Sequence, residues 1–445
     1  MCSTSAREHQ PRAAAAGRYP FTVATRTQSV QEICTQAKRA ARKLAALDTA
    51  TKNGALAAIA DAIEARAAEI LEANQADSED GRAAGLDAAF LDKLALNEQR
   101  VAQMAAGVRD IIALPDPVGE ELESRTLYNG LELHKVRSPL GVVAIVYEAR
   151  PNVTVDAAAL AIKSGNAVVL RGSSAAERSN AVLARIVAEA GEGAGLSEGS
   201  VSLIGSGDRA DLTELVQQEG LVDLVIPRGG EALKEAIKKS AKVPVIYAAA
   251  GNCHVYVDAS ADPEMAERVA FNAKVQRPGV CNASETLLVH ADVAPVVLPG
   301  LLAKLRDAGV ELRTDARTRS LIGSDGDGLL DATEEDWATE YLGMKMAVKT
   351  VDSLDEAIEH VNRYGTGHSE AIVTSDDGAA REFTDQVDAA CVYVNASSRV
   401  TDGGEFGMGA EMGNSTQKLH ARGPIGLREL TTFKYVIHGT GQIRE

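Results

Sequence analysis

Short apolar runs alternate with amphipathic segments between residues 141 and 249, and this alternation is the strongest constraint on the fold. The runs GVVAIVY, NAVVLRG, SVSLIG, VDLVIPRGG and VPVIYAA have the length of strands. The segments between them, such as TVDAAALAIKSG, space their apolar residues along one face of a helix. Apolar strands joined by helices are typical of parallel sheets covered on both faces. After about Asp258 the same rhythm starts again, so the sequence predicts an α/β fold with two doubly wound parallel-sheet domains.

The length and charge of the chain exclude several classes of protein. A chain of 445 residues is too long for one ordinary core. Its 63 acidic and 46 basic side chains give a formal net charge of -17, which repels a nucleic-acid backbone. No apolar run is long enough to span a membrane. The five cysteines form no Cys-x-x-Cys pair, which favours a reducing, cytoplasmic compartment over a disulfide framework or a zinc site.

Three segments lie outside the alternating region. Residues 1–28 are arginine-rich without a continuous apolar stretch, so we expect a disordered extension or, alternatively, a start codon placed too far upstream. Residues 30–112 are alanine-rich with helical spacing and predict a helical lead-in. Asn129-Gly130 predicts a β-hairpin with a type I′ turn. Because a two-stranded ribbon is marginally stable alone, it must pack against another element or a second subunit.

Two loops that follow predicted strands are candidates for binding a nucleotide, because doubly wound sheets bind ligands at the carboxyl ends of their strands. Neither loop has the G-x-G-x-x-G fingerprint, and each has an ordinary alternative, a tight turn or a helix N-cap. After the strand NAVVLRG, basic and hydroxyl residues occupy the place where an acidic residue would bind the ribose 2′-hydroxyl of NAD. Such residues suit a 2′-phosphate and favour NADP. The candidate residues are Arg171, Gly172, Ser173, Ser174, Arg228, Gly229 and Gly230.

Cys281, in VQRPGVCNASETLLVH, is the candidate nucleophile. A lone cysteine is more often a small core residue than a nucleophile. Against this, a Pro-Gly turn precedes Cys281, small polar residues surround it, and Arg277 brings positive charge that favours the thiolate. Asn152, after the first predicted strand, is a candidate oxyanion donor, with a helix cap as the alternative.

Six segments together resemble the gamma-glutamyl phosphate reductase family, a branch of the aldehyde dehydrogenase superfamily. The resemblance runs from about Val30 to the C-terminus. The segments are SPLGVVAIVYEARPNVTVDAAALAIKSGNAVVLRG, VDLVIPRGG, GNCHVYVD, VQRPGVCNASETLLVH, YGTGHSEAIVT and the stretch from ASSRVTDGGEFGMG to TTFKYVI.

This resemblance implies an aldehyde dehydrogenase-like fold and several site residues. Cys281 corresponds to the superfamily's nucleophile, Glu340 to the residue that holds the nicotinamide ribose, and Phe406 to a turn near the cofactor. The implied domains are an NADP-binding domain (29–123 and 139–258), a catalytic domain (259–410) and an oligomerisation ribbon (124–138 and 411–440).

The resemblance also implies the reaction, which is the NADPH-dependent reduction of L-glutamyl 5-phosphate to L-glutamate 5-semialdehyde in proline biosynthesis. Aldehyde oxidisers carry a glutamate general base where this chain has Tyr247-Ala248-Ala249-Ala250-Gly251, and its absence fits a reductase. Arg150 and Arg277 are candidates for binding the substrate carboxylate, or else form structural ion pairs. We expect a homo-oligomer and a glutamate 5-kinase partner that supplies the acyl phosphate. The alternatives are a CoA-acylating or other aldehyde dehydrogenase, and a catalytically silent assembly subunit.

Overall fold

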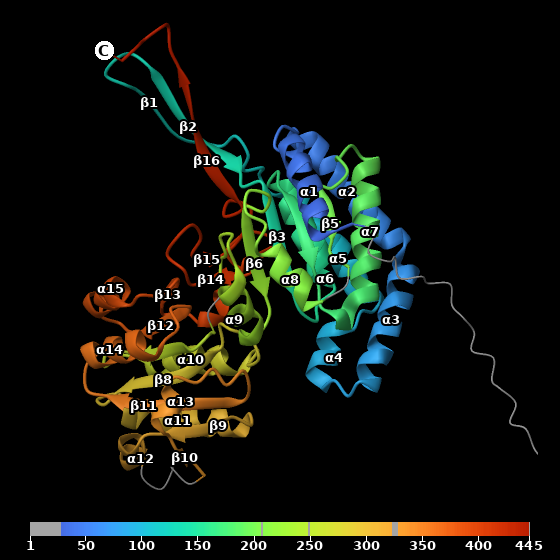
Figure 1. The fold of residues 1–445 in the computed structure, drawn as a ribbon. Helices are drawn as coiled ribbons and strands as arrows, with labels where there is room; N and C mark the ends of the chain where they lie inside the picture. The colour runs from blue at the N-terminus through green and yellow to red at the C-terminus, as the bar shows by residue number, and fades with distance from the viewer. Residues whose placement is uncertain (1–27, 206–207, 248–249, 323–327, 445) are drawn as a thin grey trace, which may run out of the picture.

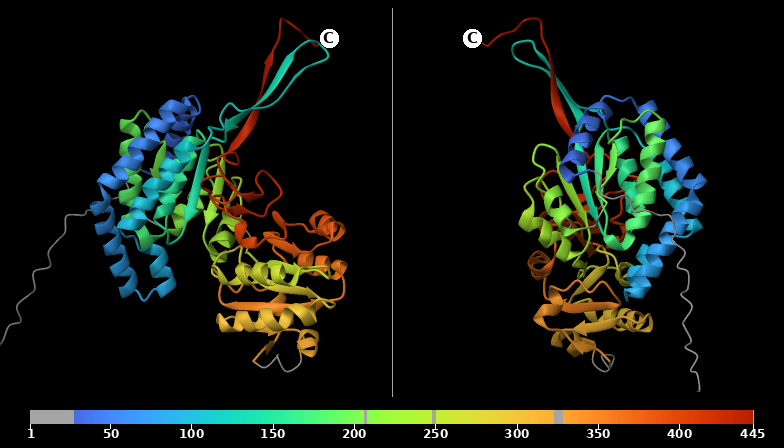
Figure 2. Two further views of the ribbon diagram at one scale, coloured as in Figure 1. Left: turned by 180° about the vertical axis from the view of Figure 1, so that it is seen from behind. Right: turned by 45° about the vertical axis from the view of Figure 1, so that its right-hand side comes forward.

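The computed structural model describes residues 28–205, 208–247, 250–322 and 328–444. Two lobes, each built around a parallel sheet, are joined by segments that cross between them, and a thin antiparallel ribbon projects from the body (Figures 1 and 2). The predicted α/β fold class is confirmed. Residues 1–27, which make up nearly all of the predicted N-terminal extension, lie outside the described part of the chain. No helix of the described part is long and apolar enough to cross a membrane.

The predicted helical lead-in forms, and its helices pack on the first lobe. Most of these helices begin at a side chain that accepts a backbone N–H, as in the capping box of Ser29 and Glu32. Helices α2 and α5 contact each other, and α2 also contacts the long helix α7 (Glu177–Gly193). The five helices are α1 (Val30–Leu44), α2 (Thr49–Ala65), α3 (Ala67–Ala83), α4 (Ala88–Leu94) and α5 (Glu98–Ala113).

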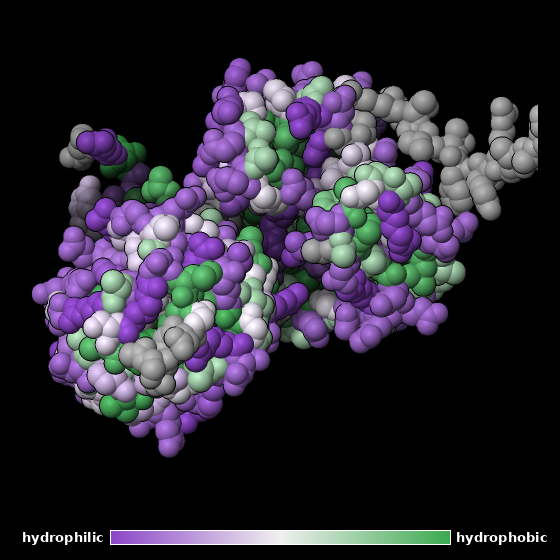
Figure 3. Space-filling model, turned by 90° about the horizontal axis from the view of Figure 1, so that it is seen from below, coloured by the Kyte–Doolittle hydropathy of each residue, from purple (hydrophilic) through white to green (hydrophobic). Residues whose placement is uncertain are grey.

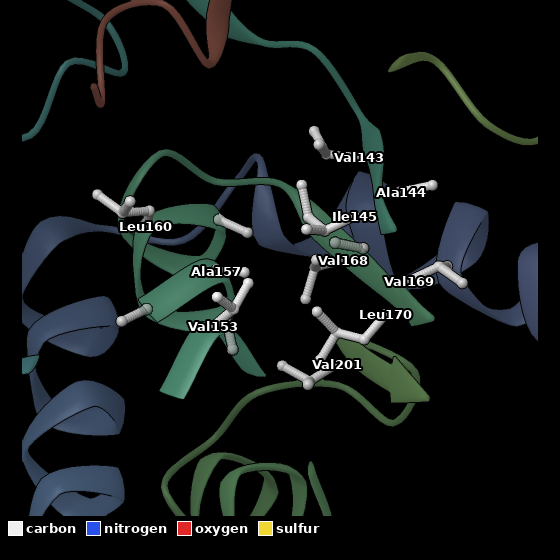
Figure 4. Close-up of a cluster of buried hydrophobic side chains, with 14 of the residues drawn as sticks. Val143, Ala144, Ile145, Val153, Ala157, Leu160, Val168, Val169, Leu170 and Val201 are labelled. Atoms are coloured by element: carbon white, nitrogen blue, oxygen red, sulfur yellow. The ribbon is translucent and has the colours of Figure 1, made fainter. Parts of the chain in front are cut away.

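The first lobe contains a four-stranded parallel sheet in the order β5-β4-β3-β6. Every residue of β3 is buried, and Figure 4 shows its Val143 and Ile145 beside Val168 of β4 and near Val153 of a covering helix. The elements of this sheet are β3 (Val142–Tyr147), α6 (Asn152–Lys163), β4 (Ala167–Arg171), η1 (Ser174–Ala176), α7 (Glu177–Gly193), β5 (Val201–Leu203), α8 (Arg209–Leu215), β6 (Leu224–Arg228) and α9 (Glu231–Ser240).

The prediction of a strand from VPVIYAA was wrong. Only a single bridge between Val225 and Val245 forms there, with Val225 N–H donating to the carbonyl of Pro244. A proline has no N–H to donate, so a regular ladder cannot continue through residue 244. Ala248 and Ala249 lie outside the described residues.

The second lobe contains a seven-stranded parallel sheet in the order β10-β9-β11-β8-β7-β12-β13. Its strands are β7 (Cys253–Val257), β8 (Ser284–His290), β9 (Glu311–Thr314), β10 (Leu330–Asp331), β11 (Lys345–Val351), β12 (Ser369–Val373) and β13 (Cys391–Val394). The helices around it are α10 (Pro263–Val275), α11 (Ala294–Asp307), α12 (Ala316–Ile322), α13 (Glu334–Trp337), α14 (Leu354–Tyr364), α15 (Asp377–Gln386) and η3 (Ser398–Val400).

Strand β7 belongs to the second sheet, although it falls within the range 139–258 that the sequence assigned to the first domain. It pairs with β8 and β12. The pairing therefore favours a boundary before Cys253 rather than after Asp258. The division into domains stays a prediction.

The predicted hairpin forms, but its turn differs from the predicted type I′. Strand β1 (Glu121–Thr126) pairs antiparallel with β2 (Glu132–Pro139), and β2 pairs with β16 (Thr431–His438). Gly130 has a φ of 81° while Asn129 has no positive φ, and Gly130 N–H donates to the carbonyl of Leu127. A type I turn followed by a left-handed glycine suits a longer hairpin loop.

The C-terminal segment divides between the ribbon and the body. Only β16 lies in the ribbon, whereas β14 (Asn414–Ser415) and β15 (Gly423–Pro424) form a small antiparallel pair against the lobes. The range 411–440 predicted for the ribbon is therefore too wide at its start.

Candidate active site

Cys281 lies in the loop between α10 and β8, and its side chain is exposed. This loop stands at the amino ends of the strands of the seven-stranded sheet. Arg228 ends β6, and Arg150 closely follows β3, so both lie at the carboxyl edge of the four-stranded sheet. The charges of Arg150 and Arg228 both act on the Cys281 thiol, which shows that the two sheet edges face each other. Figure 3 shows the surface hollowed between the two lobes.

The backbone of Cys281 is held by the segment that precedes β7. A Cβ at residue 251 would overlap the carbonyl oxygen of Cys281, so only glycine fits there. The Sγ of Cys253, which is fully buried, donates to the same carbonyl over 3.2 Å. Gly251 N–H in turn donates to Oε1 of Glu340 over 2.6 Å. Sequence reasoning did not identify the roles of Gly251 and Cys253, because nothing in their spacing links them to Cys281.

Opposing effects act on the pKa of the Cys281 thiol. Desolvation by the surrounding protein raises the pKa above its usual value, and the carboxylates of Glu340 and Glu411 raise it further. The Arg228 guanidinium and the backbone N–H of Cys281 itself lower the pKa. Both carboxylates accept backbone N–H groups, from Gly251 and Gly403 respectively, so their charges are partly offset.

Replacing Arg228 by glutamine is expected to raise the pKa of Cys281, because the variant removes a positive charge that favours the thiolate. The reacting species is the thiolate, so the pH at which alkylation by iodoacetamide reaches half its maximal rate should move upward. Arg228→Lys keeps the charge and serves as the matched control. An unchanged alkylation profile in Arg228→Gln would contradict this arrangement.

Asn152 is the first residue of α6, which places it near the same sheet edge as Arg150. Its Nδ2 donates to Oδ2 of Asp156 over 2.9 Å, and burial raises the pKa of Asp156 to about 6. An amide nitrogen has two N–H donors, so the bond to Asp156 leaves one for a substrate oxygen. Asp156 therefore orients the predicted oxyanion donor.

The loop after β4 contains one strong candidate for contact with a nucleotide. The Oγ of Ser173 is buried without a hydrogen-bond partner among the described residues, and Ser174 is exposed at the start of η1. An unpaired buried hydroxyl next to an open loop fits a polar ligand group. The neighbouring residues act inside the protein: Arg171 is buried and donates to the carbonyl of Asp208, and a Cβ at Gly172 would overlap the side chain of Asn180.

The loop after β6 is arranged differently from the prediction. Gly230 N–H, at the start of α9, donates to Oε2 of Glu148 over 2.9 Å, and a Cβ at Gly229 would crowd the same carboxylate. The carboxylate of Glu148 thus takes the place at the N-terminus of α9 where an anion was expected. The Arg228 guanidinium packs against the backbone of Gly413 and acts on Cys281. The structure therefore brings Arg228 to the thiol.

Of the remaining predicted residues, one lies beside the Cys281 thiol and the others are at least partly exposed at the surface. Glu340 lies beside Cys281 through its bond to Gly251. Arg150 and Arg277 are exposed at the level of the whole residue. Desolvation of the guanidinium lowers the pKa of Arg150, and the charges of Arg228 and Arg277 lower it further. The ring of Phe406 is 43% exposed in the loop between η3 and β14.

His254 and His368 lie beside polar segments of the chain, but both side chains are fully buried and neither is open to the surface at which Cys281 is exposed. His254 is buried and pairs with Glu370, and burial lowers the pKa of His368 to about 4. Each histidine also has a side-chain hydrogen-bond partner, Glu370 for His254 and Ser369 for His368, so both are structural residues rather than bases for Cys281.

A buried ion pair supports the turn that carries Glu340. Lys274 Nζ lies 2.5 Å from Oε2 of Glu285, and both side chains are inaccessible to solvent. Burial lowers the pKa of Lys274 and raises that of Glu285. Glu285 Oε1 accepts the N–H of Leu342, which has a φ of 51°. The pair thereby holds a strained turn close to Cys281.

Replacing Lys274 by methionine is expected to lower the free energy of unfolding by about 3 to 5 kcal/mol, since Glu285 would stay buried without its partner. Denaturant unfolding measures the loss. The matched control is the double variant Lys274→Met with Glu285→Gln, which leaves no charge behind and should recover a large part of the stability. Equal losses in the single and double variants would contradict the buried-charge argument.

Comparison with known proteins identifies the family. The aldehyde dehydrogenase family matches residues 21–320 and 331–436. A gamma-glutamyl phosphate reductase of Syntrophomonas wolfei is 54% identical over 409 residues, covering 92% of this chain and 97% of that protein. One of Heliobacterium modesticaldum is 55% identical over 409 residues with the same coverage. The chain belongs to the gamma-glutamyl phosphate reductase family.

A solved structure agrees with this assignment. The gamma-glutamyl phosphate reductase of Thermotoga maritima superimposes with a TM-score of 0.91 at 45% identity, covering 94% of this chain and all of that one. The predicted aldehyde dehydrogenase-like fold and the predicted gamma-glutamyl phosphate reductase family are thereby confirmed. As a gamma-glutamyl phosphate reductase, the chain is an oxidoreductase of proline biosynthesis, and its wider family uses nicotinamide cofactors.

Proposed function

We propose that the chain carries out the family's reaction, the NADPH-dependent reduction of L-glutamyl 5-phosphate to L-glutamate 5-semialdehyde with release of phosphate, through a thioester on Cys281. The observation that carries this proposal is the position of an exposed thiol at which the charges of Arg228 and Arg150 converge from the other lobe. Positive charge favours both the thiolate and an anionic substrate.

The sulfur supplies the covalent chemistry. The Cys281 thiolate attacks the acyl carbon, the carbon–oxygen bond to phosphate breaks, and phosphate leaves with the bonding electrons. Bound NADPH supplies the hydride that reduces the resulting thioester. The backbone N–H of Cys281 and the second amide N–H of Asn152 stabilise the oxyanion that forms, and its collapse releases the aldehyde and restores the thiolate.

Hydrolysis of the thioester would waste the substrate, and the residues near Cys281 fit its avoidance. No carboxylate side chain occurs from residue 247 to residue 251, where related oxidisers carry a general base. Glu340 and Glu411 are the carboxylates that act on the thiol, and each is already engaged by a backbone N–H. This arrangement favours reduction of the thioester over its hydrolysis.

For the cofactor, we propose NADP(H), held in the first lobe by the loop after β4. Ser173 and Ser174 supply hydroxyls for the 2′-phosphate side of the nucleotide, while Arg171 and Gly172 keep the loop in shape. Gly229 and Gly230 let the carboxylate of Glu148 approach the start of α9 closely, so their part in the cofactor site is to shape this loop. Glu340 and Phe406 approach the site from the second lobe. The choice of NADP over NAD therefore depends on the serines rather than on Arg171.

The test is the reverse assay. Purified protein receives L-glutamate 5-semialdehyde, phosphate and either NADP or NAD, and formation of the reduced cofactor is followed by absorbance. We expect strict dependence on phosphate and a higher kcat/KM with NADP. Turnover that requires CoA instead of phosphate would support the alternative of a CoA-acylating dehydrogenase. Failure of iodoacetamide to label Cys281, together with normal NADP binding, would support a silent assembly subunit.

We further propose that the ribbon makes a homo-oligomer and that a glutamate 5-kinase supplies the unstable acyl phosphate. The ribbon projects from the body with Leu122, Phe433, Tyr435 and Ile437 between 41% and 54% exposed. A three-stranded ribbon with apolar side chains so exposed has little core of its own. Tyr435→Glu should lower the sedimentation coefficient to that of the monomer, whereas Lys434→Glu on the same strand is the matched control.

A further inference from the structure

Arg399 is a fourth arginine beside the nucleophile, and sequence reasoning did not single it out. Its charge and that of Cys281 act on each other, as do the charges of Arg399 and Arg277. Among the described residues, no carboxylate lies within the 4.0 Å ion-pair distance of Arg150, Arg228, Arg277 or Arg399. The site therefore gathers four cations without an ion-pair partner among the described residues, although the charge of Asp402 reaches Arg399 from beyond that distance. Such a group of cations suits an anionic ligand.

The Arg399 guanidinium is held in place by neutral groups. Its Nε donates to Oε1 of Gln276 over 2.9 Å, and its Nη1 donates to Oδ1 of Asn282, the residue after the nucleophile. Asn282 itself is fixed, because its Nδ2 donates to the carbonyl of Thr401 over 2.7 Å and its carbonyl accepts from Oγ of Ser398 over 2.8 Å. Two of the five guanidinium donors are thus used for positioning, and the charge is left for another partner.

The substrate has a charge at each end. The acyl phosphate end must reach the sulfur of Cys281, and the α-carboxylate is separated from the reacting carbonyl by three carbon atoms. An arginine fixed on the residue next to the nucleophile is suited to the far end of such a chain. A pre-positioned guanidinium loses little freedom on binding, and its planar fork matches a carboxylate.

The other three arginines fit this task less well. Arg228 has the larger effect on the thiol and packs against Gly413, which places it at the reacting end. Arg150 follows β3 on the opposite lobe. Arg277 is exposed, and no hydrogen bond of its guanidinium is seen among the described residues. Among the described residues, Arg399 alone of these four arginines combines a charge without an ion-pair partner with a guanidinium held by side-chain hydrogen bonds.

We propose that Arg399 binds the α-carboxylate of the amino-acid substrate while Gln276 and Asn282 hold its guanidinium, so that this one residue selects aldehydes and acyl phosphates that carry a carboxylate at the far end. This inference rests on the proposed function. It makes Arg399 a specificity-determining residue that contacts substrate directly.

Two aldehydes that differ only in the far carboxylate test the proposal. Phosphate-dependent oxidation of 5-oxopentanoate and of pentanal by NADP is measured in the wild type and in Arg399→Gln. We expect kcat/KM for 5-oxopentanoate to fall about 10-fold to 100-fold, the range for loss of a hydrogen bond to a charged group, and kcat/KM for pentanal to stay within about threefold. Arg399→Lys keeps the charge but loses the planar fork, so its kcat/KM for 5-oxopentanoate should lie between those of the wild type and Arg399→Gln.

A structural role of Arg399 would give a different result. If Arg399→Gln displaced Asn282, oxidation of both aldehydes would slow equally, and alkylation of Cys281 by iodoacetamide would slow as well. Either outcome would overturn the proposal. It would also be overturned if Arg277→Gln, and not Arg399→Gln, removed the preference for 5-oxopentanoate.

A second measurement uses L-glutamate 5-semialdehyde itself. Arg399→Gln should raise KM at least about tenfold with kcat changed less, because a carboxylate contact is made in the ground state as well as in the transition state. A fall in kcat at unchanged KM would contradict the proposal. Failure of the proposed function is distinct, because the wild type would then show no phosphate-dependent turnover of this aldehyde.

Discussion

Replacing Cys281 by serine is expected to lower the phosphate-dependent oxidation of L-glutamate 5-semialdehyde by several orders of magnitude, the usual cost of removing a covalent nucleophile. The serine hydroxyl has a much higher pKa than the thiol, so Arg228 cannot bring it into the ionised form near neutral pH. Residual activity above about one hundredth of the wild type would contradict the assignment.

The matched control for this variant is Cys391→Ser. Cys391 is a half-exposed free cysteine in β13, and burial raises the pKa of its thiol. Its replacement should leave kcat within a few-fold of the wild type. Mass spectrometry after brief treatment with iodoacetamide should find Cys281 labelled first, because Cys281 is exposed and its thiolate is favoured by Arg228. Preferential labelling of Cys391 would contradict this reading of the site.

Replacing Gly251 by alanine is expected to lower kcat by at least about a hundredfold, since small misplacements of reacting groups are that costly. The added Cβ would overlap the carbonyl oxygen of Cys281, so one of the two backbone segments must move. Any such movement breaks the bond from Cys253 Sγ to the same carbonyl and shifts the Gly251 N–H away from Glu340.

Gly279→Ala is the matched control, because it lies in the same loop as Cys281 and a Cβ there would meet only the carbonyl oxygen of Leu342 at 3.7 Å. It should keep most of the activity. The rate of Cys281 alkylation and the melting temperature of both variants separate a displaced nucleophile from general unfolding. If Gly251→Ala kept wild-type kcat, the close packing of the two segments would not matter for catalysis.

The arrangement of parallel sheets was predictable because burial on both faces leaves a direct pattern in the sequence. A strand such as β3 is apolar at every position, and the helices between the strands repeat their apolar residues at helical spacing. Short sequence motifs predicted the structure less well where the conformation depends on the pairing with another segment. Asn129-Gly130 marked the hairpin, but the turn that forms uses a left-handed conformation at Gly130 alone. Pro244 reduced a predicted strand to a single bridge.

By itself, the sequence determined the fold class and the place of the hairpin, and the resemblance of its motifs pointed to Cys281 as the candidate nucleophile. Only the tertiary structure decided which residues surround Cys281. Arg228 lies near enough to the thiol for its charge to lower the pKa, and the carboxylate of Glu148 occupies the start of α9. Gly251, Cys253 and Arg399 contact the Cys281 loop. The physical reason is that periodicity records which face of an element is buried, whereas contacts between loops far apart in the chain depend on how the two sheets are placed against each other.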